Sequence, residues 1–403
     1  MMDINDMLRG GGEDDVRNQF DQAWLKRRAA LDEVHKVFRK WLSDDYDCDL
    51  LDIVLATRAS HELDGITVWL LVVSGSGGCK TETVSALRET DVHIISTIAS
   101  EGALLSASPK KGRAKTATGG LLRVIGGDGV LVVKDFTSIL SMQSVTRAPM
   151  LAALREIFDG VWVRNVGSDG GQTLTWEGRI TLIGACTTSW DEHHGVIATM
   201  GDRFALVRFD SSKHRDNSAS QSIRNGGREP EMQKELAGAA RAVIDGMSRE
   251  PITMSTQELD TIISIADVVT FARTGVVTDY RGDVVDGHMP EAPTRFAKQL
   301  AQLYCGAVAI GHGREKAMAL VKRCGHDTIP PSRLMVLLDV EANPGGNVAE
   351  IAKRLRKPFS STKRCASALT VLGLLRAEDR TDGTAGFWLG QRLNTKGFAH
   401  LKD

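Results

Sequence analysis

The sequence lacks any apolar run of the roughly 18–20 residues that would span a bilayer. Its first residues, MMDINDMLRGGGEDD, are acidic and contain no apolar core of a secretion signal. Charged residues make up 25% of the 403 and apolar residues 42%, which is ordinary globular composition. We therefore expect a cytoplasmic protein that has no membrane partner.

The six cysteines are widely scattered and form no Cys-x-x-Cys pair. Zinc sites and disulfide frameworks use characteristic cysteine spacings, so neither is expected and the thiols are predicted to be free. The formal net charge is −1. Any contact with nucleic acid must therefore come from a local basic surface and not from the overall charge.

Hydrophobic periodicity predicts helices first and then alternating strands and helices. Apolar residues recur at helical spacing over residues 14–43, and a second helix is expected over 47–60. Short apolar runs follow at 66–73, 92–97, 129–135, 179–186 and 205–209. Helical stretches, notably 148–158, lie between these runs. Strands that alternate with helices predict an α/β fold with a mainly parallel sheet covered on both faces.

Three later segments depart from this alternation. Residues 161–166 and 173–176 flank a Gly/Asp-rich turn, which predicts a β-hairpin. Residues 211–231 are polar and are predicted to be a linker or loop. Residues 231–325 are predicted to be mainly helical, apart from a Gly/Asp-rich interruption near 275–290.

The first apolar run leads into SGSGGCKTET, a sequence suited to binding phosphates. A nucleoside triphosphate needs inward-turned backbone N–H groups, a lysine near its β- and γ-phosphates and a hydroxyl on Mg²⁺. Ser74 and Cys79 stand where the usual motif has glycine, and the alternative is a glycine-rich turn with a chance lysine. The predicted ATP-binding residues of this loop are Gly75, Gly77, Gly78, Cys79, Lys80 and Thr81.

The apolar run at 129–135 ends in a single acid, Asp135. P-loop ATPases place a carboxylate here to hold Mg²⁺, and another group polarises the attacking water. Lys134 precedes Asp135 and Phe136 follows it, so the single acid could take either role but hardly both at full efficiency. Thr81 and Asp135 are the predicted Mg²⁺ residues. A capping aspartate at the end of a strand is the alternative interpretation of Asp135.

Residues 63–212 resemble the AAA+ branch of ATPases that includes the minichromosome maintenance helicases and the bacterial enhancer-binding activators. Four features carry the resemblance: the loop SGSGGCKT, the strand GVLVVKDF, the hairpin at 161–177 before the strand 179–186, and the box MGDRF at 200–204. The sequence PTRF at 293–296, before an apolar helix, extends it into a lid. The chain is also similar to uncharacterised phage and mobile-element ATPases that carry a C-terminal winged helix.

The resemblance implies roles for individual residues. Thr187 would be a polar sensor near the γ-phosphate and, with Asp135 and Arg203, a catalytic residue. Arg203 would reach into a neighbour's site in a ring-shaped homo-oligomer. Arg295 would contact the nucleotide from the lid. An ungapped alignment places Lys134 at the metal-coordinating acidic position, which predicts slow hydrolysis.

The resemblance also implies a division of the chain. It comprises a helical N-terminal region (1–62), an AAA+ nucleotide-binding core (63–212), a helical lid (213–328) and a winged-helix domain (329–403). The hairpin at 161–177 would point into the ring and grip DNA. Arg164 and Asn165 are its candidate DNA-binding residues.

The C-terminal pattern independently predicts a winged helix. Helices are expected at 331–340, 347–355 and 361–374, followed by two short strands around 380–386. Basic residues crowd the turn before the third helix and its start, which is an electrostatic footprint for double-stranded DNA. The predicted DNA-binding residues here are Lys353, Arg354, Lys363 and Arg364. A winged helix that binds protein is the alternative.

These features favour an oligomeric, ATP-driven DNA motor or remodeller, such as a helicase or helicase loader in mobile-element replication. Its cofactors would be ATP and Mg²⁺. Lys134 favours a second hypothesis, an ATP-regulated transcription factor that uses its winged helix. A third hypothesis is a nucleotide-sensing defence ATPase with no DNA substrate.

Overall fold

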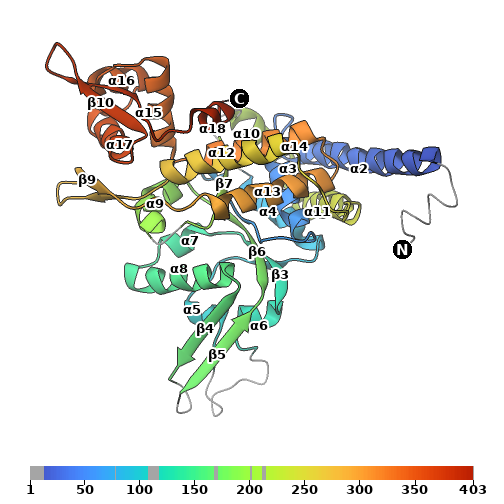
Figure 1. Ribbon diagram of the computed structural model, residues 1–403. Coiled ribbons are helices and arrows are strands. Elements are labelled where there is room, and N and C mark those ends of the chain that lie inside the picture. Colours follow the sequence, from blue (N-terminus) through green and yellow to red (C-terminus); the bar gives the residue numbers. More distant parts are fainter. Residues whose placement is uncertain are drawn as a thin grey trace.

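The computed structural model describes residues 13–77, 79–107, 118–167, 171–199, 202–210 and 215–402. Its centre is a five-stranded sheet in the order β2-β3-β6-β1-β7 (Figure 1). The strands are β1 (Trp69–Ser74), β2 (His93–Ile95), β3 (Asp128–Val133), β6 (Arg179–Cys186) and β7 (Ala205–Phe209). All neighbouring pairs run parallel, which confirms the predicted α/β class with a parallel sheet.

Both faces of this sheet are covered by helices, as its apolar strands require. In β1, Leu70 and Val72 face one hydrophobic cluster, whereas Leu71 and Val73 face another. The helices of the first face include α2 (Glu13–Trp41), α3 (Cys48–Ser60), α4 (Lys80–Ser85), α11 (Glu229–Asp245) and α13 (Thr294–Ala309). Those of the second face are α5 (Glu101–Leu104), α6 (Leu121–Ile125), α7 (Thr137–Leu140), α8 (Ser144–Phe158) and α9 (Ser189–Thr199).

Helix α3 lies inside the protein and joins the N-terminal segment to the rest. Twelve of its thirteen residues are buried, because it packs against α13 as well as against the sheet. Gly306 of α13 permits this approach, since a Cβ there would lie 2.0 Å from the carbonyl oxygen of Ala56. Helices α2 and α3 therefore share one hydrophobic core with the sheet and with the helices that follow it.

The edge strand β7 is closed by α14 (Arg314–Thr328). The N–H of Leu206 donates to Thr328 Oγ1 (3.0 Å), and the N–H of Arg208 donates to Asp327 Oδ2 (2.8 Å). These bonds satisfy donors that an edge strand would otherwise expose. The segment predicted as a lid therefore packs on the sheet. It also contains α10 (Arg215–Arg224), in place of the predicted linker, and α12 (Thr256–Ala272).

Two hairpins extend from this body (Figure 1). Strands β4 (Val161–Val166) and β5 (Gln172–Glu177) form the predicted hairpin, which projects as an arm. Trp162 and Trp176 face each other across it, both buried, and Trp176 Nε1 donates to the carbonyl oxygen of Gly126 (2.8 Å). A second hairpin, β8 (Val276–Thr278) with β9 (Val284–Gly287), occupies the predicted Gly/Asp-rich interruption.

The last part of the chain is a small unit of helices and one antiparallel strand pair. It comprises α15 (Pro331–Ala342), α16 (Val348–Leu355), α17 (Phe359–Val371), β10 (Leu375–Asp379), β11 (Ala385–Leu389) and α18 (Thr395–His400). The first five agree with the predicted order, whereas α18, which packs on α12, was not predicted. All six cysteines are free, as their spacing predicts. Within the described ranges, every helix is too short or too polar to cross a membrane.

Candidate functional site

The phosphate-loop sequence connects the carboxyl end of β1 to α4. Gly77 and Cys79 have φ angles of 77° and 55°, so both lie in the left-handed region of the backbone. Glycine adopts this conformation easily, whereas cysteine does so at a cost, which explains why the usual motif has glycine at the Cys79 position. Gly78 lies outside the described residues. The loop therefore has the local conformation that its glycine content predicts.

Lys80 is buried beneath this loop, with 9% of its surface exposed. Its Nζ donates to the carbonyl oxygens of Ser74 (3.2 Å) and Gly75 and to Ser74 Oγ (3.1 Å). Burial lowers the pKa of Lys80, while the negative charge of Asp135 opposes that shift. The hydrogen bonds of the ammonium group thus go to neutral oxygens and not to a carboxylate, so it has no ion-pair partner to give up for an incoming anion.

Asp135 lies close to Lys80 and also caps the next turn. Its Oδ1 accepts a hydrogen bond from the N–H of Ser138 (3.3 Å), just inside α7. Its charge acts on both Lys80 and the Cys186 thiol. Asp135 therefore has a feature of each interpretation. It lies close to Lys80, as a site residue would, and it also caps a helical turn. Burial raises the pKa values of Cys79 and Cys186 to about 11, so neither is a thiolate nucleophile at neutral pH.

Lys134 and Thr81 line the same cavity, of about 490 Å³, together with Glu82, Ile94 and Leu236. A cation in the cavity that Thr81 lines repels Mg²⁺. Among the described residues, no three acidic, histidine or cysteine side chains are grouped to hold a metal ion.

Thr187 follows β6 and belongs to a group of hydroxyls at the same edge of the sheet. Its N–H donates to Thr137 Oγ1 (2.9 Å), and its Oγ1 lies 2.8 Å from Ser189 Oγ. Because β1, β3 and β6 are parallel neighbours, their carboxyl ends bring Lys80, Asp135 and Thr187 to one edge. The structure therefore brings together three of the predicted site residues.

A second cavity, of about 280 Å³, opens beside Cys79 and includes residues that the sequence did not single out. Tyr46, in the connection between α2 and α3, lines it, and its hydroxyl lies 2.8 Å from Thr83 Oγ1 in α4. Burial raises the pKa of Tyr46, so its hydroxyl stays protonated. The loop thus lies between two cavities. The only sequence signal for Tyr46 is an aromatic residue among the aspartates of 44–47.

Arg203 and Arg295 lie at the opposite edge of the sheet. Arg203 pairs with Asp159 (3.1 Å), and its carbonyl oxygen accepts from Gln299, which also bonds the N–H of Trp69. Trp69 begins β1 and Ser74 ends it, so these edges are about 17 Å apart at about 3.3 Å per residue.

Arg295 belongs to this amino edge as well. It lies 3.7 Å from Glu291, and burial, followed by the nearby charge of Arg203, lowers its pKa. The lid helix α13 begins at the amino ends of the strands, so Arg295 lies far from Lys80 of its own chain. Its predicted contact with a nucleotide stays a prediction.

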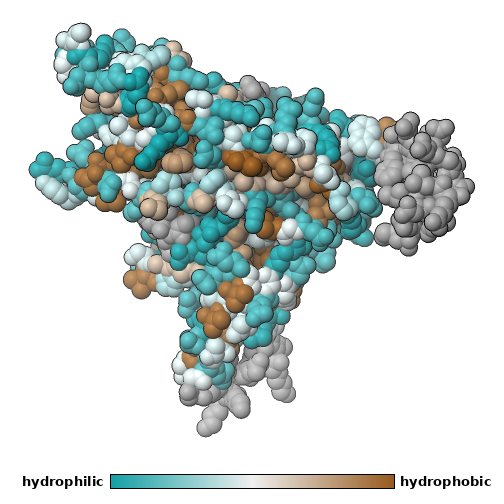
Figure 2. All heavy atoms as spheres, viewed as in Figure 1, coloured by the Kyte–Doolittle hydropathy of each residue, from teal (hydrophilic) through white to brown (hydrophobic). Residues whose placement is uncertain are grey.

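The residues predicted to bind DNA fall into two groups. Arg164 and Arg354 are held in ion pairs: Arg164 pairs with Glu101 (2.7 Å), and Arg354, although at the surface, pairs with the buried Asp339 (2.6 Å). Asn165, Lys353, Lys363 and Arg364 are exposed. The arm also has an exposed apolar side, on which Val161 and Val163 are 47% and 54% exposed; Figure 2 shows apolar groups on the surface of this arm.

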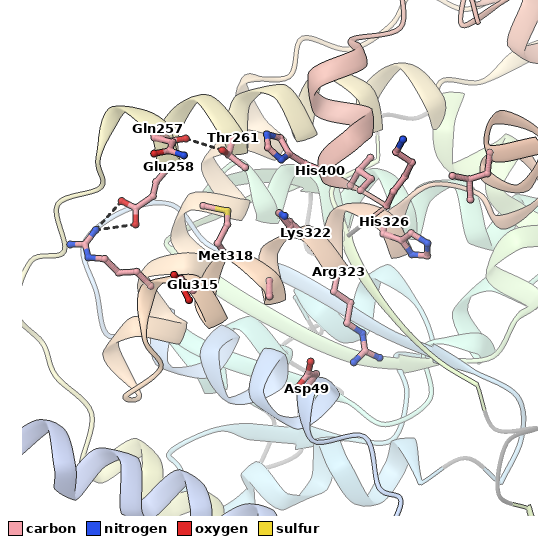
Figure 3. Close-up of a pocket in the computed structure, with 15 residues that line it drawn as sticks. Asp49, Gln257, Glu258, Thr261, Glu315, Met318, Lys322, Arg323, His326 and His400 are labelled. Carbon is pink, nitrogen blue, oxygen red and sulfur yellow. Dashed lines mark hydrogen bonds and ion pairs between the residues drawn. The ribbon is translucent and has the colours of Figure 1, made fainter. Parts of the chain in front are cut away.

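A larger cavity, of about 810 Å³, lies between α12, α14 and α18 (Figure 3). Glu258 at its rim pairs with Arg314 (2.8 Å) and caps α12. Burial alone would raise the pKa of Glu258, but hydrogen bonds from Tyr304, Ser255 and Arg314 bring it to about 2. These charges hold helices together, and the residues predicted for nucleotide or DNA binding lie elsewhere.

Comparison with known proteins gives no family assignment. No family model matches the chain, and no curated protein matches it. Among solved structures, it is similar to the apo A form of the NrS-1 C-terminal region, with 11% identity and a TM-score of 0.29. That alignment covers 89% of this chain and 75% of the other. A likeness of this size carries no argument about function.

Proposed function

We propose that this protein is an AAA+ type P-loop ATPase that acts as an oligomeric motor or remodeller on DNA. The observation that carries the proposal is the placement of Lys80. It is a buried cation held only by loop oxygens at the carboxyl end of a central parallel strand. Asp135 and Thr187 stand on the neighbouring strand ends.

Within this proposal the loop residues bind and orient the phosphates of ATP. Lys80 would exchange its bonds to Ser74 and Gly75 for phosphate oxygens, Thr81 would offer its hydroxyl, and backbone N–H groups from Gly75 to Cys79 would surround the phosphates. The cavity beside Tyr46 and Cys79 has room for a nucleoside. Bound ATP supplies the phosphoanhydride bond that is hydrolysed. Thr187 would donate a hydrogen bond to the terminal phosphate.

We propose that hydrolysis is slow, because Lys134 competes with the metal. Its position in the cavity that Thr81 lines supports this, since a like charge in a partly dry site weakens Mg²⁺ binding. Asp135 is then the one acid of this segment for both anchoring the metal and polarising water. Slow hydrolysis also suits a second candidate function, a transcription factor in which ATP binding controls assembly.

Assembly into an oligomer follows from the separation of the two sheet edges. A phosphate held by Lys80 needs further positive charge as its bond breaks, and an arginine is the usual source. Arg203 and Arg295 lie at the far edge of the same chain, which supports a role for them in the site of an adjoining chain. A closed ring of identical chains would give every site such a neighbour.

We further propose that the C-terminal unit is a winged helix that binds double-stranded DNA. The order α15, α16, α17, β10, β11 supports this, as does a bridge between Gly346 and Phe387 that adds a third short segment to the strand pair. Helix α17 would be the recognition helix. Lys353, Lys363 and Arg364 present exposed charge for phosphates, and protein binding stays the alternative.

The test is the ATPase rate of the purified full chain with and without duplex DNA, together with its assembly state. We expect ATP-dependent assembly and a rate that DNA raises. Lys80→Ala should show neither. Sequence-specific DNA binding without turnover would favour the transcription factor. Absence of ATP binding by the wild-type chain would contradict both candidates.

A further inference from the structure

The hairpin β8–β9 lies against helix α17 of the C-terminal unit (Figure 1). At its turn, Asp283 Oδ1 is 3.4 Å from Lys363 Nζ. Gly282 of the same turn touches the Arg364 guanidinium, because a Cβ at Gly282 would lie 3.1 Å from it. A hairpin of one region thus contacts both basic residues at the start of α17.

The base of β9 approaches the other end of the same helix. A Cβ added to Gly287 would lie 3.2 Å from side-chain atoms of both Val371 and Leu372. Along α17, Ser360, Lys363, Arg364, Ser367 and Val371 form one stripe, since they recur at intervals of one helical turn. Most of this stripe is exposed, whereas the opposite residues Thr362, Ala366 and Leu369 are buried. The hairpin therefore contacts this stripe at Lys363, Arg364 and Val371, while most of the stripe stays open to solvent.

With the hairpin turn against Lys363 and Arg364, α17 and the hairpin would enter a DNA groove together. The major groove of B-DNA is about 12 Å wide and admits one α-helix or one two-stranded ribbon. A helix with its side chains is already about 10–12 Å across. A helix with a hairpin on its outward face exceeds that width. Asp283 also brings negative charge to the lysine that would meet a phosphate.

We propose that the β8–β9 hairpin is an autoinhibitory mask, which must leave the outward face of α17 before that helix binds DNA. This inference rests on the proposed DNA-binding function. The hairpin base is fixed, because Arg273 pairs with Glu291 and donates to the carbonyl oxygen of Phe204 (3.1 Å). Opening therefore moves the turn away from Lys363 and Arg364, while the base stays against Val371.

The contacts of the turn are weak enough to open reversibly. The Lys363 and Asp283 side chains are 52% and 54% exposed, and exposed ion pairs contribute little. The turn itself is preformed, because Asp279 Oδ1 accepts from the N–H groups of Arg281 and Asp283, each at 2.9 Å. DNA phosphates, which are numerous and fixed in space, can displace one exposed carboxylate.

The experiment measures binding of a fluorescent duplex by the full chain at fixed salt. Asp283→Asn should tighten binding about threefold to fivefold, the size expected for one exposed ion pair. Gly287→Leu, which pushes β9 away from Val371, should tighten it about tenfold, since it removes the packing contact too. Asp286→Asn is the control, with the same charge change at an acid that bonds within the hairpin.

The gain from Asp283→Asn should disappear in a Lys363→Ala background, because the two residues form one pair. Equal tightening by Asp283→Asn and Asp286→Asn would overturn the mask, since only general charge would then matter. Weaker binding by a folded Gly287→Leu would overturn it as well, by making the hairpin part of the DNA surface. If the wild-type chain binds DNA and no variant changes the affinity, the mask is contradicted but the DNA-binding function is not. If neither the wild-type chain nor any variant binds DNA, the DNA-binding function is contradicted as well.

Discussion

At the carboxyl edge of the sheet, Lys80 is surrounded by neutral loop oxygens. At the amino edge, Arg203, Arg273 and Arg295 lie beside the carboxylates of Asp159, Asp202 and Glu291. A cation among neutral dipoles keeps its net charge for a ligand, whereas a cation in an ion pair is already compensated. The first edge is therefore built to receive an anion. At the amino edge, the arginines must break their ion pairs before they can bind an anion.

The largest effect should come from the carboxyl edge. We expect Lys80→Ala to lower ATP turnover by about 10³-fold, because no other buried cation of the described chain faces the loop at that edge. Binding of a fluorescent ATP analogue should fall as well. Lys396→Ala, which removes an exposed lysine of α18, is the control. Normal nucleotide binding by Lys80→Ala would show that the loop is not the phosphate site.

Arg295→Ala should distinguish the role of the amino edge from that of the carboxyl edge. We expect turnover of the assembled protein to fall by about 10²-fold, because a charge near the reacting phosphate is lost. Affinity of the dilute, unassembled chain for ATP should stay within about twofold, since Arg295 is distant from Lys80 of its own chain. A large loss of affinity in the unassembled chain would return Arg295 to the lid role that the sequence predicts.

The contrast between paired and available cations recurs in the C-terminal unit. Arg354→Ala leaves the buried Asp339 unpaired and should lower the free energy of unfolding by about 2 kcal/mol, discounted for the partial exposure of the arginine. The neighbouring exposed Lys353→Ala should change it by less than about 0.5 kcal/mol. Urea unfolding measures both. Equal stability of the two variants would mean that the Arg354 pair has no structural importance.

The smallest effect on turnover is expected at Lys134, which stands where the resemblance implies a metal-coordinating acid. Lys134→Asp replaces a cation by a carboxylate in the cavity that Thr81 lines and should raise turnover about tenfold at saturating Mg²⁺. Lys134→Gln, which removes the charge without adding a ligand, should raise it less. Wild-type turnover already within about 1–100 s⁻¹ would refute the slow site.

The sequence predicted the sheet well because its strands are short apolar runs bounded by turn residues. The predicted strand at 179–186 matches β6, and the predicted strand at 205–209 matches β7. The polar composition of residues 211–231 predicted a linker. Helix α10 forms there instead, although almost no large apolar residue marks it. Helix α18 and the β8–β9 hairpin were missed because each is too short to show a period.

Site residues could be predicted where a side chain of suitable chemistry directly follows a predicted parallel strand. Lys80, Asp135 and Thr187 each follow an apolar strand, so a parallel sheet must gather them. Arg354 and Lys353 are adjacent and equally basic in sequence, yet only tertiary contacts show that Arg354 is held by Asp339. Tyr46 lines the cavity beside Cys79 through packing of distant segments, and an aromatic residue among aspartates does not by itself indicate that packing.

The most direct measurement mixes two defective chains, Lys80→Ala and Arg203→Ala. Each alone should be nearly inactive, because every site lacks either its lysine or its arginine. In an equal mixture, about a quarter of the interfaces join an intact Lys80 to an intact Arg203 of the adjoining chain, so ATPase activity should recover to about that fraction. No recovery, with both variants and their mixture assembled normally, would contradict a nucleotide site shared between the two edges of neighbouring chains.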